Sequence, residues 1–161
     1  MTEIPGVSRP AALRFTLPCD LKQVRQAAQT VHHFLAEQGC DEQTLSACDL
    51  ALVEACNNAI KYAPEGGTVS LQCRKQGDQY VVSVSDNGPG IPADMQHRIF
   101  ERFFRVDKSR SRSEGDTGGA GLGLSIARLI AEAHHGRLEL TRSDSSGSTF
   151  TAFLPVSTSL C

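Results

Sequence analysis

The sequence has 161 residues, which is enough for one domain with a proper core and too few for two ordinary ones. Its hydrophobic fraction of 40% and charged fraction of 21% are those of a globular protein, and a net charge of −2 gives no reason to expect nucleic acid or an anionic membrane as partner. No apolar run approaches the ~18 residues needed to cross a bilayer, and the N-terminal stretch MTEIPGVSRP has no apolar secretory core. We therefore expect a cytoplasmic protein, with a flexible tail over residues 1–10 and a single domain over residues 11–161.

Six cysteines could indicate a disulfide framework, so their spacing matters. The sequence contains no CxxC pair and no histidine at zinc-finger spacing. Three of the cysteines fall on predicted apolar faces, where a free cysteine behaves as a small hydrophobe. We expect reduced thiols at all six positions, which are Cys19, Cys40, Cys48, Cys56, Cys73 and Cys161.

The first third of the chain predicts one strand and two helices. Residues 13–17 alternate in the manner of a half-buried strand. Asp20 is a suitable N-cap for a helix over about residues 20–37. Asp41 caps a second helix that has one apolar face and ends before Pro64.

The next elements form a predicted β-hairpin. Strands over about residues 67–75 and 79–86 are joined by the short turn Gln76-Gly77-Asp78. The second strand runs directly into the loop Asn87-Gly88-Pro89-Gly90.

The last third predicts helices interleaved with strands. A short helix is expected around residues 94–104, followed by a polar stretch over residues 105–119. A helix over about residues 121–135 comes next, and then strands near residues 136–142 and 148–154. This order predicts the α+β class, with a mainly antiparallel sheet and helices on one of its faces.

A polar stripe lies beside the apolar face of the second helix. Glu54, Asn58 and Lys61 or Tyr62 recur at helical spacing, so their side chains share one side of the helix. The amide oxygen of Asn58 could coordinate Mg²⁺, and the carboxylate of Glu54 could accept a proton. Taken alone, the stripe is better explained as a solvated helix face.

The strand end Asp86-Asn87-Gly88-Pro89-Gly90 is a second candidate for ligand binding. Glycines allow a backbone to approach a ligand closely, and an aspartate can accept a hydrogen bond from a buried amino group. An ordinary turn has a similar sequence.

The glycine-rich stretch from Gly118 to Gly123 opens a predicted helix. Unpaired N–H groups and the positive end of the helix dipole favour phosphate at such a terminus. The stretch is not a Walker A loop, because no Gly-Lys-Ser/Thr follows it, and no VAIK-like strand makes it a protein-kinase loop. A flexible linker is the alternative, but an apolar helix begins at once.

Together, the order and spacing of these motifs resemble the GHKL superfamily, which includes the catalytic domains of histidine kinases. Residues 58–62 (NAIKY) match its N box, and residues 86–91 (DNGPGI) match its G1 box. Residues 99–105 (IFERFFR) match the F box, and residues 119–124 (GAGLGL) match the G2 box. The resemblance implies the two-layer α/β sandwich known as the Bergerat fold, with ATP and Mg²⁺ as cofactors.

The same resemblance implies the roles of individual residues. Asp86 would hold the adenine amino group and Asn58 would ligate Mg²⁺, while Lys61 would reach a phosphate and Tyr62 would lie near the base or ribose. The remaining residues that would contact the nucleotide are Gly88 and Gly90 at the adenine, Gly119, Gly121 and Gly123 at the phosphates, Lys108, Arg110 and Arg112 of a mobile lid over residues 105–117, and Ile91, Phe104, Leu122 and Leu124 of the motifs.

The first part of the chain resembles the anti-sigma-factor kinases of the RsbW and SpoIIAB type. It carries their LPxD-like turn as Leu17-Pro18-Cys19-Asp20 and their E-A-x-x-N-A motif as residues 54–59. Histidine kinases usually have Asn where Glu54 stands, and a carboxylate there suits a catalytic base that deprotonates a hydroxyl. This resemblance implies a serine/threonine kinase of a partner-switching system that phosphorylates a STAS-domain antagonist, with Glu54 as the base. A sigma factor as second target and a homodimer are left open.

Two alternatives remain, because the F box and lid read more like those of a histidine kinase. One is a histidine-kinase catalytic domain whose phosphoacceptor is supplied in trans. The pair His32-His33 lacks the acidic residue and proline that follow a phosphoacceptor histidine in that family. The other is a nucleotide-dependent module that sequesters a partner without transferring phosphate.

Overall fold

The computed structural model describes residues 12–105 and 122–156, so the tail over residues 1–10 and most of the predicted lid lie outside the described residues. The chain forms three helices and five strands within that part. In chain order they are β1 (Ala12–Pro18), α1 (Leu21–Glu37), α2 (Glu42–Tyr62), β2 (Thr68–Gln76), β3 (Gln79–Asp86), α3 (Gly123–Ala133), β4 (Arg137–Asp144) and β5 (Gly147–Pro155). None of these helices is long and apolar enough to span a membrane.

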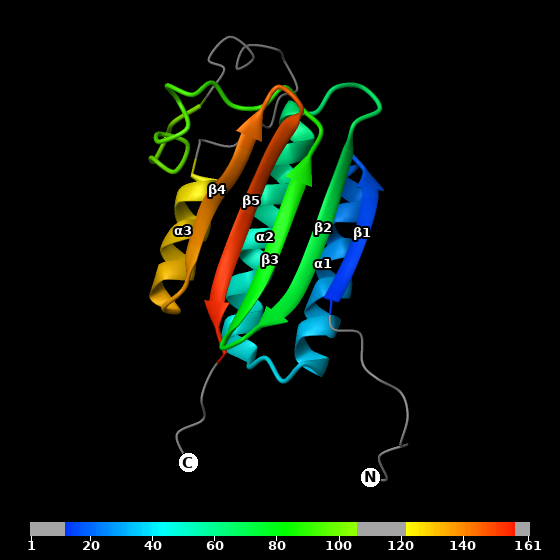
Figure 1. Cartoon of the computed structure of the whole chain (residues 1–161), viewed down its shortest axis with the longest axis vertical. Helices are drawn as coiled ribbons and strands as arrows, with labels where there is room; N and C mark the ends of the chain where they lie inside the picture. Colours follow the sequence, from blue (N-terminus) through cyan, green and yellow to red (C-terminus); the bar gives the residue numbers. More distant parts are fainter. Residues whose placement is uncertain (1–11, 106–121, 157–161) are drawn as a thin grey trace.

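The five strands make one sheet in the order β1-β2-β3-β5-β4, and every pairing between described strands is antiparallel. All three helices lie behind the sheet in Figure 1, and its other face carries none of them. The predicted α+β class and the two-layer sandwich are therefore confirmed. No pair among the described strands is parallel, which agrees with the mainly antiparallel sheet that the sequence predicts.

The period-2 pattern of the strands explains which face the helices cover. One row of paired residues crosses the whole sheet and carries an apolar side chain on every strand: Phe15, Leu71, Val84, Phe150 and Leu140. Four of the five strands contribute fully buried side chains to the core, and β1 contributes partly buried ones. The hydrophobic row therefore fixes the register, because a slip of one residue would turn it to solvent.

The opposite face of the sheet is lined by hydroxyl groups. Thr16 bonds to Ser70 across β1 and β2 at 2.8 Å, and Ser85 bonds to Thr149 across β3 and β5 at 2.9 Å. Cross-strand hydroxyl pairs stabilise a sheet without apolar cover.

Helices α1 and α2 begin where the sequence predicts. Asp20 accepts a hydrogen bond from the backbone N–H of Lys22, and Asp41 accepts bonds from the N–H groups of Gln43 and Thr44. Such caps satisfy N–H groups that have no partner inside the helix.

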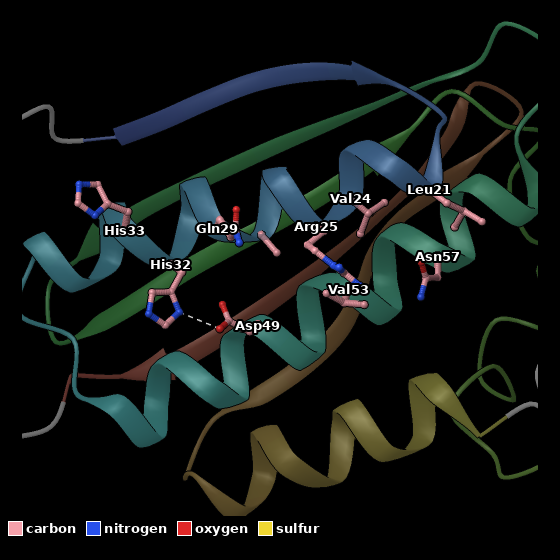
Figure 2. Close-up of a pocket in the computed structure, with 10 residues that line it drawn as sticks. Leu21, Val24, Arg25, Gln29, His32, His33, Asp49, Val53 and Asn57 are labelled. Atoms are coloured by element: carbon pink, nitrogen blue, oxygen red, sulfur yellow. Dashed lines mark hydrogen bonds and ion pairs between the residues drawn. The ribbon is translucent and has the colours of Figure 1, made fainter.

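Of the two histidines of α1, His32 is half-exposed and His33 is exposed. His32 Nδ1 lies 2.8 Å from Asp49 Oδ2 of α2, and His33 Nε2 lies 3.4 Å from Glu37 Oε1. Figure 2 shows the His32–Asp49 pair in a groove of about 620 Å³ between α1 and α2, on the side away from the sheet. This pair links the two helices across the groove.

The described cysteines are all free, which agrees with the prediction of reduced thiols, while Cys161 lies outside the described residues. Four of them are buried in the core. Burial raises the pKa of the Cys56 and Cys73 thiols to about 12, so both stay protonated at neutral pH. They act as small apolar side chains.

Two predicted elements are corrected by the structure. The helix expected around residues 94–104 is instead a series of turns, in which N–H groups bond to carbonyls three residues back at Met95, Arg98, Glu101 and Phe104. Phe103 has a φ of 63°, which a regular helix does not allow. The helix expected over residues 121–135 is shorter at its end, because His135 has a φ of 60° and Gly136 already bonds back to Ala131.

Candidate active site

The polar stripe predicted on α2 lies at half depth. Glu54, Asn58, Lys61 and Tyr62 are each neither buried nor fully exposed. Within the part of the chain that the structure describes, neither Glu54 nor Asn58 makes a side-chain hydrogen bond, while Lys61 lies 5.6 Å from the centre of the Tyr62 ring. Burial raises the pKa of the Glu54 carboxyl above its ordinary value. A carboxylate in this setting is a better proton acceptor than one in water.

The N-terminus of α3 lies beside this stripe. Its N-cap position, Leu122, provides no side-chain hydrogen bond to the first turn. Gly123, the first residue of the helix, is in contact with Glu54, because a Cβ on Gly123 would overlap Glu54 Oε2. Backbone N–H groups at an uncapped helix N-terminus are suited to bind an anion.

Asp86 ends β3 and is held through one of its two oxygens. Asp86 Oδ1 accepts hydrogen bonds from the N–H of Gly88 at 2.9 Å and from the N–H of Ser148 at 3.2 Å. Asp86 Oδ2 has no hydrogen-bond partner among the described residues. Because Asp86 is held through Oδ1, its Oδ2 is left to accept a hydrogen bond from a ligand amino group.

The loop after Asp86 packs against the turn between β4 and β5. The N–H of Ile91 donates to Ser143 Oγ at 2.7 Å, and Ser143 Oγ lies 3.0 Å from Ser148 Oγ. A Cβ on Gly90 would overlap the Asp144 carbonyl oxygen, and one on Gly147 would overlap the Asp86 carbonyl oxygen. The hairpin therefore clamps the loop from one side.

Sequence reasoning missed this clamp. Ser148 begins a predicted strand, and Ser143 and Gly147 fall between the two predicted strands, yet these residues hold the loop that carries Asp86. The sequence SSGSTF gives a turn signal but does not show which distant loop the turn contacts.

The remaining predicted residues divide into two groups. Ile91, Phe104 and Leu124 are partly buried and pack against the core, and Arg98 lies 4.6 Å from the Phe104 ring centre. The backbone of Gly88 lies against the Tyr62 carbonyl, which places the loop beside the end of α2. The predicted residues of the lid and of the first part of the glycine-rich stretch lie outside the described residues: Lys108, Arg110, Arg112, Gly119 and Gly121.

These features converge at one end of the sheet. In Figure 1 the end of α2, the loop after β3, the β4–β5 turn and the start of α3 all lie toward the upper end. The geometry fits a purine nucleotide with phosphates, because an aspartate oxygen is left for the amino group and an uncapped helix terminus is left for the phosphates. Asn58, one turn beyond Glu54, offers the neutral oxygen that Mg²⁺ accepts as a ligand.

A fold of this kind with such a site defines a class of nucleotide-binding domains. Residues 45–158 match the model of the family described as histidine kinase-, DNA gyrase B- and HSP90-like ATPases. The match covers more than half of the chain, so the chain belongs to this family, and ATP with Mg²⁺ is its cofactor.

The relatives with high identity are sensor kinases. The chain is 48% identical over 105 residues to the sensor-like histidine kinase SenX3 of Mycolicibacterium smegmatis, covering 65% of this chain and 27% of SenX3. It is 42% identical over 101 residues to the sensor histidine kinase WalK of Bacillus subtilis, covering 62% of this chain and 16% of WalK. The chain thus spans about a quarter or less of the length of these curated relatives.

Solved histidine-kinase structures share the fold. The full-length kinase ShkA, in complex with AMPPNP, has a TM-score of 0.61 and 28% identity, with 91% of this chain and 32% of ShkA covered. The mycobacterial sensor histidine kinase MprB has a TM-score of 0.57 over 88% of this chain and 97% of that chain, at 24% identity. The curated sensor kinases agree with the alternative of a histidine-kinase catalytic domain, and they leave the resemblance to anti-sigma-factor kinases unconfirmed.

Proposed function

We propose that this chain is the ATP-binding catalytic domain of a histidine-kinase-type phosphotransfer system. It would deliver the terminal phosphoryl group of ATP to a histidine of a separate domain or protein. The observation that carries this proposal is that Asp86, held through one oxygen, lies at the same end of the sheet as the uncapped N-terminus of α3. The identity to sensor histidine kinases supports histidine as the acceptor.

The residues of the chain would bind and orient the nucleotide. When bound, ATP supplies the phosphoryl group, and Mg²⁺ offsets the charge of the phosphates. Asp86 Oδ2 would accept a hydrogen bond from the base, and the amide oxygen of Asn58 would ligate the metal. The first-turn N–H groups of α3 would face the phosphates. Positioning and charge stabilisation supply most of the catalysis in phosphoryl transfer.

The two histidines of α1 are poor acceptors in this arrangement. His32 and His33 lie on α1, where each pairs with a carboxylate. Their helix lies behind β1 and β2, whereas α3 lies at the opposite edge of the sheet (Figure 1). Neither histidine of this pair is therefore expected to be the acceptor.

The test is binding followed by transfer. Calorimetry with Mg²⁺-ATP should show binding, and γ-labelled ATP with an isolated two-helix phosphoacceptor domain of a histidine kinase should give a labelled domain. Label that is lost in acid and kept in alkali identifies phosphohistidine. ATP binding without transfer to a panel of such domains would contradict the proposal.

A second candidate, transfer to serine or threonine, is favoured by one specific observation. Glu54 stands where a base would be needed, its pKa is raised by burial, and it contacts the first residue of α3. A serine hydroxyl needs a base, whereas neutral imidazole already has a free lone pair. The acceptor would then be a STAS-domain antagonist of the partner-switching kind, with a sigma factor as a further target.

Glu54→Gln separates the two candidates. If Glu54 is the base of a serine kinase, this variant keeps near-native ATP affinity but loses about 10²–10⁴-fold in transfer rate. The label on a STAS-domain acceptor would be stable in acid and lost in alkali. A transfer rate within about threefold of the wild-type rate would exclude Glu54 as an essential base. Asn58→Ala serves as the comparison, since loss of a metal ligand should weaken binding and transfer together.

A further inference from the structure

The contact between Glu54 and Gly123 joins two helices at the candidate phosphate end of the site. A Cβ built on Gly123 would overlap Glu54 Oε2 and lie 2.9 Å from Glu54 Cδ. Real Cβ atoms essentially never come closer than 3.0 Å to another heavy atom, so any larger residue at 123 displaces the carboxylate. Because glycine has no side chain, Glu54 can occupy the space that a Cβ at position 123 would fill.

The close approach of α2 and α3 explains why the space is so small. The two helices are in contact, and both carry alanines that are almost completely buried: Ala51 and Ala55 of α2 and Ala127 and Ala131 of α3. Short side chains at a helix contact bring the axes close together. Glu54 adjoins Ala55 in sequence, and its carboxylate contacts the N-terminal residue of α3.

The backbone gives no other reason for a glycine at position 123. Its φ is not positive, unlike that of Gly90 or Gly147. Gly123 is also the first residue of an α-helix, and glycine is a poorer helix former than alanine. The contact with Glu54 is the local feature that an alanine would disturb.

We propose that Gly123 is a positioning residue for Glu54, keeping the carboxylate at the N-terminus of α3. This inference rests on the proposed function, because it gives the carboxylate a place beside the phosphates. It also changes the role predicted for Gly123. The glycine makes room for the Glu54 side chain, and not only for the nucleotide. A shorter acid at position 54 should then tolerate a Cβ at position 123.

The test is a double-mutant cycle with Gly123→Ala and Glu54→Asp. The effects of Gly123→Ala and Glu54→Asp on the Tm should be non-additive by about 3 °C or more, because the shorter acid at position 54 leaves room for a Cβ at position 123. In parallel, the Glu54 carboxyl is titrated by ¹³C NMR. Gly123→Ala should move its pKa down toward the ordinary value of about 4.3, because the displaced side chain reaches solvent.

The control pair is Gly123→Ala with Glu132→Asp. Glu132 is exposed near the other end of α3. The effect of Glu132→Asp on the Tm should therefore add to the effect of Gly123→Ala. Additive effects for the Glu54 pair as well, with an unchanged Glu54 titration, would overturn the inference. An equal loss of Mg²⁺-ATP affinity on Gly123→Ala with Glu or Asp at position 54 would assign the glycine to the nucleotide instead.

The test of this inference can fail or succeed independently of the test of the proposed function. A wild-type chain that binds no Mg²⁺-ATP would refute the proposed function, yet the Tm cycle and the titration would still decide the Glu54–Gly123 contact. Conversely, ATP binding with additive Tm effects would refute only this inference.

Discussion

Two carboxylates in different surroundings define the site at the scale of single residues. Asp86 is fixed by two backbone N–H groups on one oxygen, whereas Glu54 makes no hydrogen bond to the described part of the chain and is held by packing. The first arrangement suits recognition, because a rigid acceptor selects a donor. The second suits proton transfer or charge sensing, because the group is free to change its partner.

The recognition role of Asp86 predicts the effect of an isosteric change. In Asp86→Asn the carbonyl oxygen keeps the bonds from Gly88 and Ser148, so the new NH₂ group takes the place of Oδ2. A donor would then face the donor of the adenine, at a cost of about 1–3 kcal/mol. Calorimetry should show an ATP affinity about ten- to a hundredfold lower.

A control for this change lies at the other end of the sheet. Asp78→Asn alters the turn between β2 and β3 in the same chemical way and should leave ATP affinity unchanged. Equal affinities for the Asp86→Asn protein and the wild type, with both folded, would remove Asp86 from the binding site.

The raised pKa of Glu54 predicts a pH-dependent stability. The folded state favours the protonated carboxyl, so this group stabilises the fold at low pH, and that contribution is lost as the pH rises through the raised pKa. Glu54→Gln, which stays neutral, should therefore melt at a higher temperature than the wild type at pH 7. The difference in Tm should shrink as the pH falls below the ordinary glutamate value of about 4.3. A Tm difference that does not change with pH would contradict this account.

At the scale of elements, the β4–β5 turn acts as a clamp on the loop after β3. Gly147 has a φ of 139°, and a Cβ there would overlap the Asp86 carbonyl oxygen and lie 2.8 Å from its carbon. Gly77, in the turn between β2 and β3, has a φ of 60° and no atom within 4 Å of its Cβ position. The two glycines differ in crowding, while both have a positive φ.

This difference predicts unequal effects of alanine. Gly77→Ala should cost about 1–2 kcal/mol from backbone strain alone, whereas Gly147→Ala should cost more and should also weaken ATP binding. Urea unfolding measures the first effect and calorimetry measures the second. Equal losses of stability, with native ATP affinity in the Gly147→Ala protein, would show that the clamp does not position Asp86.

The same elements show how far sequence reasoning reaches. The caps at Asp20 and Asp41 and the alternation of β1 are local signals, and the elements they predict are confirmed. The helix predicted around residues 94–104 is wrong, because its apolar residues pack on the core from turns: Ile99 is buried, and Phe100 meets Phe150 edge-on at 6.2 Å. Tertiary packing overrides the local pattern there.

In the candidate site, too, local features could be predicted and long-range contacts could not. Asp86, Glu54 and Asn58 could be found from motifs, because each lies in a recognisable local sequence. The contacts of Ser148 with Asp86 and of Gly123 with Glu54 span 62 and 69 positions in sequence. Such pairs depend on sheet order and helix packing, which a single sequence does not show.

At the scale of the whole molecule, apolar side chains remain exposed near the site. Ile126 and Leu129 of α3 are 44% and 56% exposed, and Phe103 in the neighbouring turns is 68% exposed. The two segments are in contact, since the Arg128 guanidinium lies 5.1 Å from the Phe100 ring centre. Exposed apolar groups beside a phosphate site are suited to bind the protein that accepts the phosphoryl group.

This surface yields a prediction that separates docking from ATP binding. The double variant Ile126→Ser, Leu129→Ser should bind Mg²⁺-ATP like the wild type, because both side chains point to solvent and not into the core. Its rate of transfer to the acceptor domain should fall about tenfold or more, since central apolar contacts carry most of the affinity of an interface. Leu21→Ser is the control, as Leu21 is 65% exposed on α1, at the far side of the molecule from α3 (Figure 1). If the double variant transfers phosphoryl groups as fast as the Leu21→Ser protein at sub-saturating acceptor, α3 does not dock the acceptor.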